Sequence, residues 1–165
     1  NGIDYNEFNP ETDPNITKNV QCKELRKEKI KNKIQLQKDL GLEQDPKAMM
    51  IGIVSRLTDQ KGFDLIAYIM DELCQDAVQI VALGTGEERY ENMFRHFDWK
   101  YHGKVSAQIY YDEAMSHRIY AASDAFLMPS LFEPCGLSQL MSLRYGTLPT
   151  RQRDRWSEGY SCPVQ

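Results

Sequence analysis

Residues 49 to 73 read MMIGIVSRLTDQKGFDLIAYIMDEL, and this stretch decides the fold. Its first six residues form a short, uninterrupted apolar run, which suits a parallel strand buried on both faces. From Gly62 to Leu73 the apolar residues return at helical spacing, beginning with Phe63 and Ile66. The stretch therefore predicts a buried strand, a short loop and then a helix.

The same strand and helix unit recurs three more times along the chain. The further pairs are 78–83 with 85–97, 105–110 with 113–122, and 125–128 with 137–144. Strands that alternate with helices indicate an α/β domain, and four such steps predict a parallel, right-handed, doubly wound sheet.

The chain ahead of the first strand divides into two parts. Asn1 to Pro14 is rich in Asn, Asp and Pro, which predicts an irregular lead-in. Ile16 to Leu40 predicts a charged helix that ends at Gly41, a residue typical of helix C-termini. Within it, residues 23–38 read KELRKEKIKNKIQLQK, and this lysine-rich run predicts a solvated helix face.

Composition narrows the function classes. The 165 residues, 41% of them hydrophobic, suffice for the core of one domain. A net charge of -4 and a pI near 5.4 lack the basic surface that nucleic acid or an anionic membrane attracts, so we expect neither partner. The sequence has no bilayer-length apolar stretch and no signal-peptide pattern. Because it opens without Met, we expect a piece of something longer.

Four scattered cysteines, with no CxxC pair, favour a reducing cytoplasm. The three histidines are not spaced as metal ligands beside them. We therefore expect no metal and no cofactor.

Polar residues and glycines cluster where the predicted strands end. Arg56 and Lys61 follow the first strand, Gly84-Thr85-Gly86 the second, Tyr111 the third, and Ser130 with Glu133 the fourth. The carboxyl ends of parallel strands form one rim, where helix N-termini direct N–H groups and partial positive charge at a bound anion. The pattern predicts a site for a phosphorylated ligand.

Each of these residues also has a purely structural interpretation. Arg56 and Lys61 can be two solvated cations near a helix start. Gly84 can simply allow a tight turn, and its surroundings match neither the Rossmann glycine fingerprint nor a P-loop. For Tyr111 the default interpretation is structural: the ring packs under a neighbouring loop. For His117, pairing with a carboxylate or with solvent is favoured over a role as a catalytic base.

Glu133 is harder to explain structurally. It stands between Phe132 and Pro134, and an apolar setting either perturbs a carboxylate or requires a partner for it. A functional role is therefore favoured for Glu133.

Several long motifs occur together in one order. They are NGID with FNPETD, LQKDLGL, IGIVSRLTDQKGFDLI, LGTGEERYE and YYDEAMSHRIYAASDAFLMPSLFEPCGLSQLMSLRYGTLP. From Asn1 to Pro149 the chain resembles the C-terminal half of bacterial glycogen synthase and plant starch synthase. These are retaining glycosyltransferases that use ADP-glucose and adopt the two-domain GT-B fold. The resemblance implies a Rossmann-like nucleotide-sugar-binding domain over residues 1–149, truncated relative to the family.

The resemblance also implies roles for individual residues. Arg56 and Lys61 would contact the diphosphate of ADP-glucose and stabilise the departing ADP. Tyr111 would stack on the adenine, and Glu133 would face the donor glucose as the active-site carboxylate. Further substrate-binding positions are Gly84, Cys135 as a cleft-lining residue, and Gly136, Leu137 and Ser138 through their backbone N–H groups. Many GT-B relatives have a second glutamate where this chain has Met141, to which no role is assigned.

The implied reaction suits these groups. Glucose transfer to the non-reducing end of an α-1,4-glucan, with retention, passes through an oxocarbenium-like state while ADP gathers negative charge. Fixed cations and helix-terminal N–H groups stabilise that charge, and no covalent nucleophile is required. Two interpretations of Glu133 stay open: it stabilises positive charge or it positions the sugar.

The likeness stops after Pro149, where the chain reads TRQRDRWSEGYSCPVQ. A choice of synonymous codons for this segment reads LVRETGGLKDTVAPY when translation starts one nucleotide later, which is how the family would continue. Residues 150–165 are therefore predicted to be a frameshifted, non-native tail, with the Thr-Gly-Gly donor-phosphate loop lost.

Three hypotheses for function remain. The first is a glucosyltransferase of glycogen or starch synthesis, with the donor-binding domain in this chain. The second is that the isolated chain binds the nucleotide sugar without turnover, because the resemblance places the Lys-x-Gly-Gly-Leu segment in a domain before Asn1. The third is another GT-B enzyme, such as a sucrose-forming or trehalose-forming transferase. Donor (ADP-glucose or UDP-glucose) and acceptor (glycogen or starch) stay open.

Overall fold

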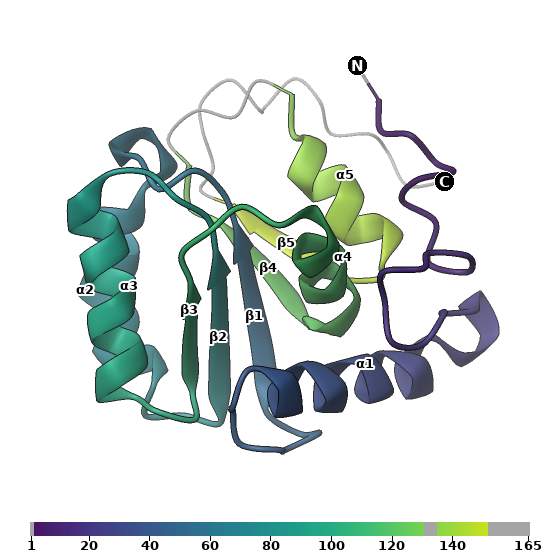
Figure 1. Ribbon diagram of the computed structural model, residues 1–165, viewed down its shortest axis with the longest axis horizontal. Helices are drawn as coiled ribbons and strands as arrows, with labels where there is room; N and C mark the ends of the chain where they lie inside the picture. Colours follow the sequence, from purple (N-terminus) through teal and green to yellow (C-terminus); the bar gives the residue numbers. More distant parts are fainter. Residues whose placement is uncertain (1, 131–134, 152–165) are drawn as a thin grey trace.

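The computed structural model describes residues 2–130 and 135–151 (Figure 1). Its strands are β1 (Met49–Val54), β2 (Val78–Leu83), β3 (Val105–Gln108), β4 (Ala125–Met128) and β5 (Leu148–Arg151). Its α-helices are α1 (Leu25–Asp39), α2 (Phe63–Leu73), α3 (Glu88–Lys100), α4 (Glu113–Ala122) and α5 (Leu137–Arg144). Short 3₁₀ turns over Cys22–Glu24 and Asp59–Lys61 precede α1 and α2.

The strands form one parallel sheet in the order β3-β2-β1-β4-β5. In the centre, Ile51 of β1 pairs with Ile80 of β2 on one side and with Ala125 of β4 on the other. Helices α2 and α3 cover one face, and α1, α4 and α5 lie on the other (Figure 1). The predicted doubly wound α/β sheet is thus confirmed, and its connections reverse direction between β1 and β4, where such sheets bind ligands.

The start of α1 differs from the prediction. The helix begins at Leu25 and not at Ile16, because the preceding segment is tied down in a non-helical form. The Asn32 side chain accepts a hydrogen bond from the Lys18 backbone N–H (3.0 Å) and donates one to the Lys18 carbonyl (2.8 Å). Burial of Ile16 and Val20 against the core adds to this restraint.

The lysine-rich run is not simply a solvated face, and that prediction is wrong for part of it. Lys29 and Lys33 are 8% and 4% exposed. Lys29 Nζ donates to the carbonyls of Tyr120 and Tyr145 at 3.3 and 3.0 Å, while Lys33 Nζ contacts Asp124 Oδ2 at 2.6 Å. Long aliphatic stems lie along the core while the ammonium groups reach carbonyl and carboxylate partners, which a hydrophobicity pattern does not register.

Strand β5 was not predicted, and two further boundaries moved. β3 ends at Gln108 and not at Tyr110. Leu148 is 65% exposed, and the Leu148–Arg151 segment is an edge strand by its pairing with β4 and not by an apolar pattern. α3 begins at Glu88 and not at Thr85, since the Thr85 carbonyl remains bonded to the Leu57 N–H at 2.9 Å.

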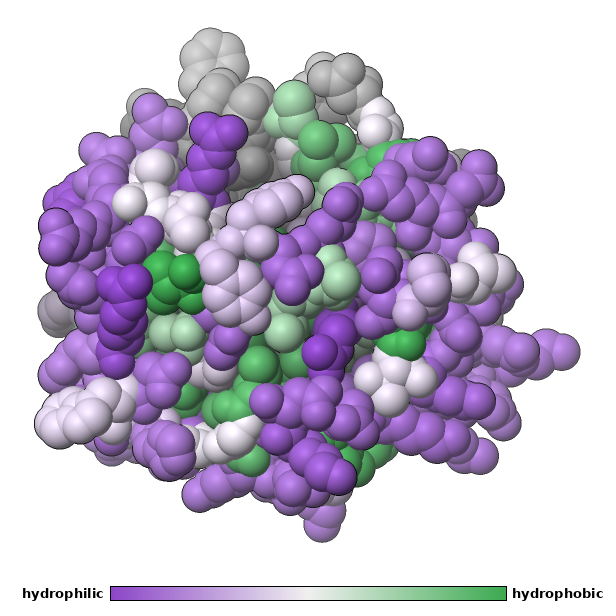
Figure 2. Space-filling view, in the orientation of Figure 1, coloured by the Kyte–Doolittle hydropathy of each residue, from purple (hydrophilic) through white to green (hydrophobic). Residues whose placement is uncertain are grey.

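The face shown in Figure 2 is largely hydrophilic, with apolar side chains reaching it over α5. There Leu140 and Leu143 are 39% and 54% exposed. Among the described residues, no helix has the length and apolar character required to cross a bilayer.

Candidate active site

A cavity of about 410 Å³ opens at the carboxyl ends of β1 and β2, and we call it the rim cavity. Its lining residues are Phe8, Val54, Ser55, Arg56, Leu83, Gly84, Thr85, Tyr110, Tyr111, Asp112, Glu113, Ser116, Tyr120 and Met141. Three residues singled out by sequence, Arg56, Gly84 and Tyr111, therefore lie around one cavity although they follow three different strands. The rim position predicted for them is where the structure places them.

Pairing between the loops after β1 and β2 holds Arg56 in place. Backbone hydrogen bonds continue beyond the strands, from Ser55 N–H to the Leu83 carbonyl at 3.1 Å and from Glu87 N–H to the Leu57 carbonyl at 2.7 Å. The residue between them, Arg56, is exposed and carries its guanidinium on a restrained backbone. The backbone that carries this cation is therefore in place before any ligand arrives.

Gly84 permits the close approach of these two loops. A Cβ at this position would lie 1.8 Å from the Ser55 carbonyl oxygen. No side chain fits there, so the requirement for glycine is steric. This contact agrees with the interpretation of Gly84 as part of a tight βα turn. Both Ser55 and Gly84 line the rim cavity, so the contact also shapes its wall.

Tyr111 is 86% exposed and not packed under a loop. The purely structural interpretation of this residue is therefore wrong. The neighbouring Asp112 caps α4 by accepting a hydrogen bond from Met115 N–H at 3.1 Å. The helix therefore begins just beyond Tyr111. A large aromatic ring left open at a cavity edge offers a face for stacking.

Lys61 and Ser138 lie in a narrow cleft next to the rim cavity. The cleft also contains Ser130, and it shares Val54 and Ser55 with the rim cavity, so the two spaces adjoin. Arg56 and Lys61 are therefore on the same side of the molecule.

Gly62 sets the position of Lys61. It has a positive φ of 71°, which glycine adopts readily, and a Cβ there would lie 2.1 Å from the Pro129 carbonyl oxygen. The loop after β1 is thereby packed onto the end of β4.

The first turn of α5 borders this cleft through Ser138. Gly136 is its N-cap residue with φ 60°, and as a glycine it has no side chain with which to cap the helix. Cys135 and Leu137 are exposed, and neither lines the two adjoining spaces. Glu133, the predicted carboxylate, lies outside the described residues.

Phe8 and Tyr120 are among the lining residues that sequence reasoning missed. Phe8 comes from the lead-in segment, where its apolar side chain among Asn, Asp and Pro was the available signal. Burial raises the pKa of Tyr120 to about 12, and a hydrogen bond with Ser138 acts to lower this pKa. That bond links α4 to the first turn of α5.

His117 lies under the rim cavity, in contact with Phe8. The two rings stack with centroids 4.6 Å apart. His117 Nδ1 is 2.6 Å from Asp13 Oδ2, and Tyr145 also hydrogen-bonds this carboxylate. The expected pairing of His117 with a carboxylate is confirmed, although the partner comes from the lead-in. Burial, followed by the bond to Asp13, raises the pKa of Tyr145, so its hydroxyl is the donor.

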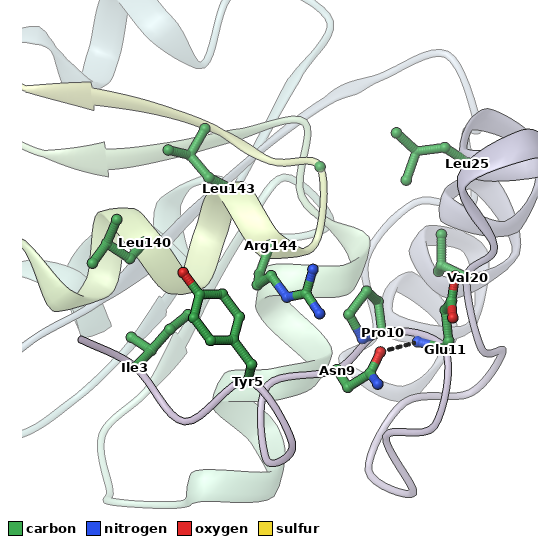
Figure 3. Close-up of a pocket in the computed structure, with 11 residues that line it drawn as sticks. Ile3, Tyr5, Asn9, Pro10, Glu11, Val20, Leu25, Leu140, Leu143 and Arg144 are labelled. Carbon is green, nitrogen blue, oxygen red and sulfur yellow. Dashed lines mark hydrogen bonds between the residues drawn. The ribbon is translucent and has the colours of Figure 1, made fainter. Parts of the chain in front are cut away.

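A second cavity, of about 580 Å³, lies between the lead-in and α5 (Figure 3). Figure 3 shows Tyr5 beside Leu140 and Arg144, and the Arg144 guanidinium is 5.1 Å from the Tyr5 ring centroid. This cavity is larger than the rim cavity. It does not adjoin the strand ends where the loop glycines and cations converge, so the rim cavity is the better candidate active site.

The fold and the rim cavity define a class of protein: an α/β domain with a cavity at the carboxyl ends of a parallel sheet, lined by an exposed cation and an exposed aromatic ring. The chain belongs to the family of group 1 glycosyl transferases, whose family model matches residues 48–149.

Individual relatives agree with this family. The chain is 72% identical over 149 residues to the glycogen synthase of Lachnospira eligens, and 64% identical over 149 residues to that of Lachnoclostridium phytofermentans. Each match covers 90% of this chain and 31% of the relative. The chain thus spans about a third of the length of these relatives.

A solved structure shares the fold. The catalytic domain of starch synthase IV from Arabidopsis thaliana, bound to ADP and acarbose, superposes with a TM-score of 0.80 and 39% identity. The match covers 92% of this chain and 31% of that one. The sequence-based prediction of a GT-B glycosyltransferase domain, made from motifs, is confirmed.

Proposed function

We propose that this chain forms the donor-binding domain of a glucosyltransferase in glycogen or starch synthesis. The parent enzyme transfers glucose from ADP-glucose to the non-reducing end of an α-1,4-glucan and retains the anomeric configuration. The observation that carries the proposal is the convergence of Arg56, Gly84 and Tyr111 on one cavity. High identity to glycogen synthases and the ADP-bound starch synthase relative support it.

In this proposal the rim cavity holds the ADP part of the donor. Tyr111 stacks on adenine, and Arg56 with Lys61 in the adjoining cleft neutralises the diphosphate as charge gathers on it. Backbone N–H groups of Gly136, Leu137 and Ser138, at the start of α5, face the same anion. Glu133 faces the donor glucose.

We propose further that the chain alone binds the donor without turnover. The cations that stabilise the leaving group lie in this domain, whereas the relatives are about three times longer. The acceptor glucan needs surfaces beyond one domain in a two-domain enzyme. We place the protein in the cytoplasm, a reducing compartment, in keeping with its scattered cysteines.

Calorimetric titration of the 165-residue chain with ADP tests the donor site. Arg56→Ala should weaken ADP binding about tenfold or more, because a charge-assisted contact contributes about 1.5–3 kcal/mol. Arg95→Ala is the matched control: Arg95 lies on the far part of α3, paired with Glu91 at 3.5 Å. Equal affinity for ADP in the two variants would rule out the assigned site.

A coupled assay for ADP release in the presence of glycogen tests the second part. We expect saturable ADP-glucose binding and no primer-dependent release from this chain. Competition between ADP and UDP for the chain separates the ADP-glucose assignment from UDP-using GT-B enzymes, with tighter binding of ADP expected.

We also propose that residues 150–165 result from a one-nucleotide slip. The family model ends at residue 149, and similarity to the relatives extends over 149 residues of this chain. In the shifted frame, Leu and Val replace Thr150 and Arg151, and apolar residues suit a parallel strand such as β5 better. Sequencing the encoding DNA decides this: codons that cannot yield LVRETGGLKDTVAPY would disprove it.

A further inference from the structure

Glu7, Glu113 and His117 converge at the edge of the rim cavity. Each offers one ligand atom, and these atoms all lie within 4.8 Å of one another. Glu113 is the first residue of α4 and His117 follows one turn later, so both project from the same helix face. Glu7 comes from the lead-in, more than a hundred residues earlier.

The orientation of His117 is determined by its other ring nitrogen. Tyr145 gives its single hydroxyl proton to Asp13, so it has none for His117 Nδ1, which lies 3.1 Å from its oxygen. Both neighbours of Nδ1, Asp13 Oδ2 and the Tyr145 oxygen, are then acceptors, so the proton resides on Nδ1. Phe8, stacked on the ring, prevents it from rotating. The remaining nitrogen, Nε2, then carries a lone pair.

His117 is 1% exposed, and its Nε2 has no hydrogen-bond partner among the described residues. An unsatisfied buried acceptor costs about 1–3 kcal/mol. The two neighbouring glutamates, when ionised, are also acceptors and cannot donate to it. Glu7 and Glu113 hydrogen-bond to each other, which raises the pKa of Glu7, but neither satisfies His117 Nε2. A cation bound to all three side chains would replace that hydrogen bond and satisfy Nε2.

We propose that Glu7, Glu113 and His117 form a site for one divalent first-row metal ion of the Zn²⁺ or Mn²⁺ type. A histidine that binds metal through one nitrogen usually donates its other N–H to a carboxylate, which is the arrangement of His117 and Asp13. An imidazole ligand beside two carboxylates favours such ions over Mg²⁺ or Ca²⁺, which take oxygen ligands.

The present separations suit this site after a small closure. Ligand atoms at about 2.0–2.2 Å from one metal ion stand roughly 3–3.5 Å apart in a tetrahedral site. The buried imidazole stays in place, while the exposed Glu7 and Glu113 side chains exchange their mutual hydrogen bond for the metal ion and move inward. Their exposure also leaves a coordination position for water.

The ion would fasten the lead-in to α4 at the wall of the rim cavity. Phe8 follows Glu7 and lines that cavity together with Glu113, so a bound ion determines how the lead-in lies against the cavity. The site is separate from the cations assigned to the diphosphate, and it does not depend on the proposed glucosyl transfer.

Titration of the metal-free 165-residue chain with Zn²⁺, followed by calorimetry, tests the site. Co²⁺ replaces Zn²⁺ in a parallel absorption measurement, because its spectrum distinguishes nitrogen and oxygen ligands from thiolates. We expect one ion per chain, without thiolate bands. Glu7→Gln and Glu113→Gln should each weaken binding about tenfold or more, since even supporting residues of metal sites have effects of that size.

Glu11→Gln is the matched control, because Glu11 is an exposed glutamate of the same lead-in segment and lies outside the cluster. It should bind Zn²⁺ like the unmodified chain. Circular dichroism checks that all variants fold alike, which is expected for exposed side chains. No saturable binding, thiolate bands, or equal affinity in Glu7→Gln, Glu113→Gln and Glu11→Gln would each overturn the proposal.

Discussion

Asp13 Oδ2 and His117 Nδ1 lie 2.6 Å apart, although the two residues are separated by 104 positions in the sequence. Both side chains are buried, and Tyr145 hydrogen-bonds the same carboxylate. This contact joins the lead-in to α4 and, through Tyr145, to the end of α5. The lead-in is thus an integral part of the domain.

Asp13→Asn should lower the free energy of unfolding by about 2–3 kcal/mol, because an ionised acceptor of two buried hydrogen bonds is replaced by a neutral amide. Urea denaturation followed by circular dichroism measures this. Asp4→Asn is the control, since Asp4 is exposed and accepts a local turn bond from Asn6 N–H at 2.8 Å. Equal unfolding free energies in the two variants would contradict the buried network.

Tyr111→Ala should weaken ADP binding by about 5- to 150-fold, since loss of base stacking costs about 1–3 kcal/mol. The unfolding free energy should barely change, because the ring is 86% exposed. Tyr68→Ala, which removes a ring that is 89% exposed on α2, serves as the control. Fluorescence titration with ADP is the measurement, and unaltered affinity in Tyr111→Ala would exclude adenine stacking there.

Gly84→Ala should destabilise the domain by about 1–3 kcal/mol and weaken ADP binding at the same time. The new methyl group would meet the Ser55 carbonyl oxygen at 1.8 Å and push the two rim loops apart. In Gly2→Ala the methyl group meets nothing within 4 Å, so neither property should change. Thermal unfolding and ADP titration of both variants check this; a neutral Gly84→Ala would mean that the loops separate without cost.

Lys29 should make the stability of the domain depend on pH. Burial lowers its pKa from 10.5 to about 7, with Asp124 acting in the opposite direction. Between these values the unfolded chain binds more protons than the folded one, so this group's contribution to stability rises as pH increases from about 7 to 10.

Comparison with Lys29→Met isolates that contribution. The advantage of the unmodified chain over Lys29→Met should grow by up to a few kcal/mol across this pH range, at about 1.4 kcal/mol for each unit of pKa shift. Urea denaturation at several pH values measures it. Lys31→Met, which alters an ammonium whose side chain is 58% exposed, should show a constant difference from the unmodified chain. A constant difference for Lys29→Met as well would show that Lys29 keeps its proton in the folded state.

Local patterns predicted most of the sheet. The apolar runs of β1 and β2 end where predicted, and the helical spacing of α2 and α4 places them within a residue of their bounds. Patterns failed where a long-range contact overrides local preference. Asn32 holds the segment after Ile16 out of the helix, and β5 exists because β4 offers it an edge.

The sequence by itself determined the class of fold, the glycosyltransferase motifs and the rim on which Arg56, Gly84 and Tyr111 would lie. It could do so because short, local sequence patterns predict buried strands and the loops that follow them. Only the tertiary structure decided that Lys29 is buried, that Asp13 orients His117, and that Glu7 meets Glu113. Those three relationships join residues far apart along the chain, and packing around the shared core creates them.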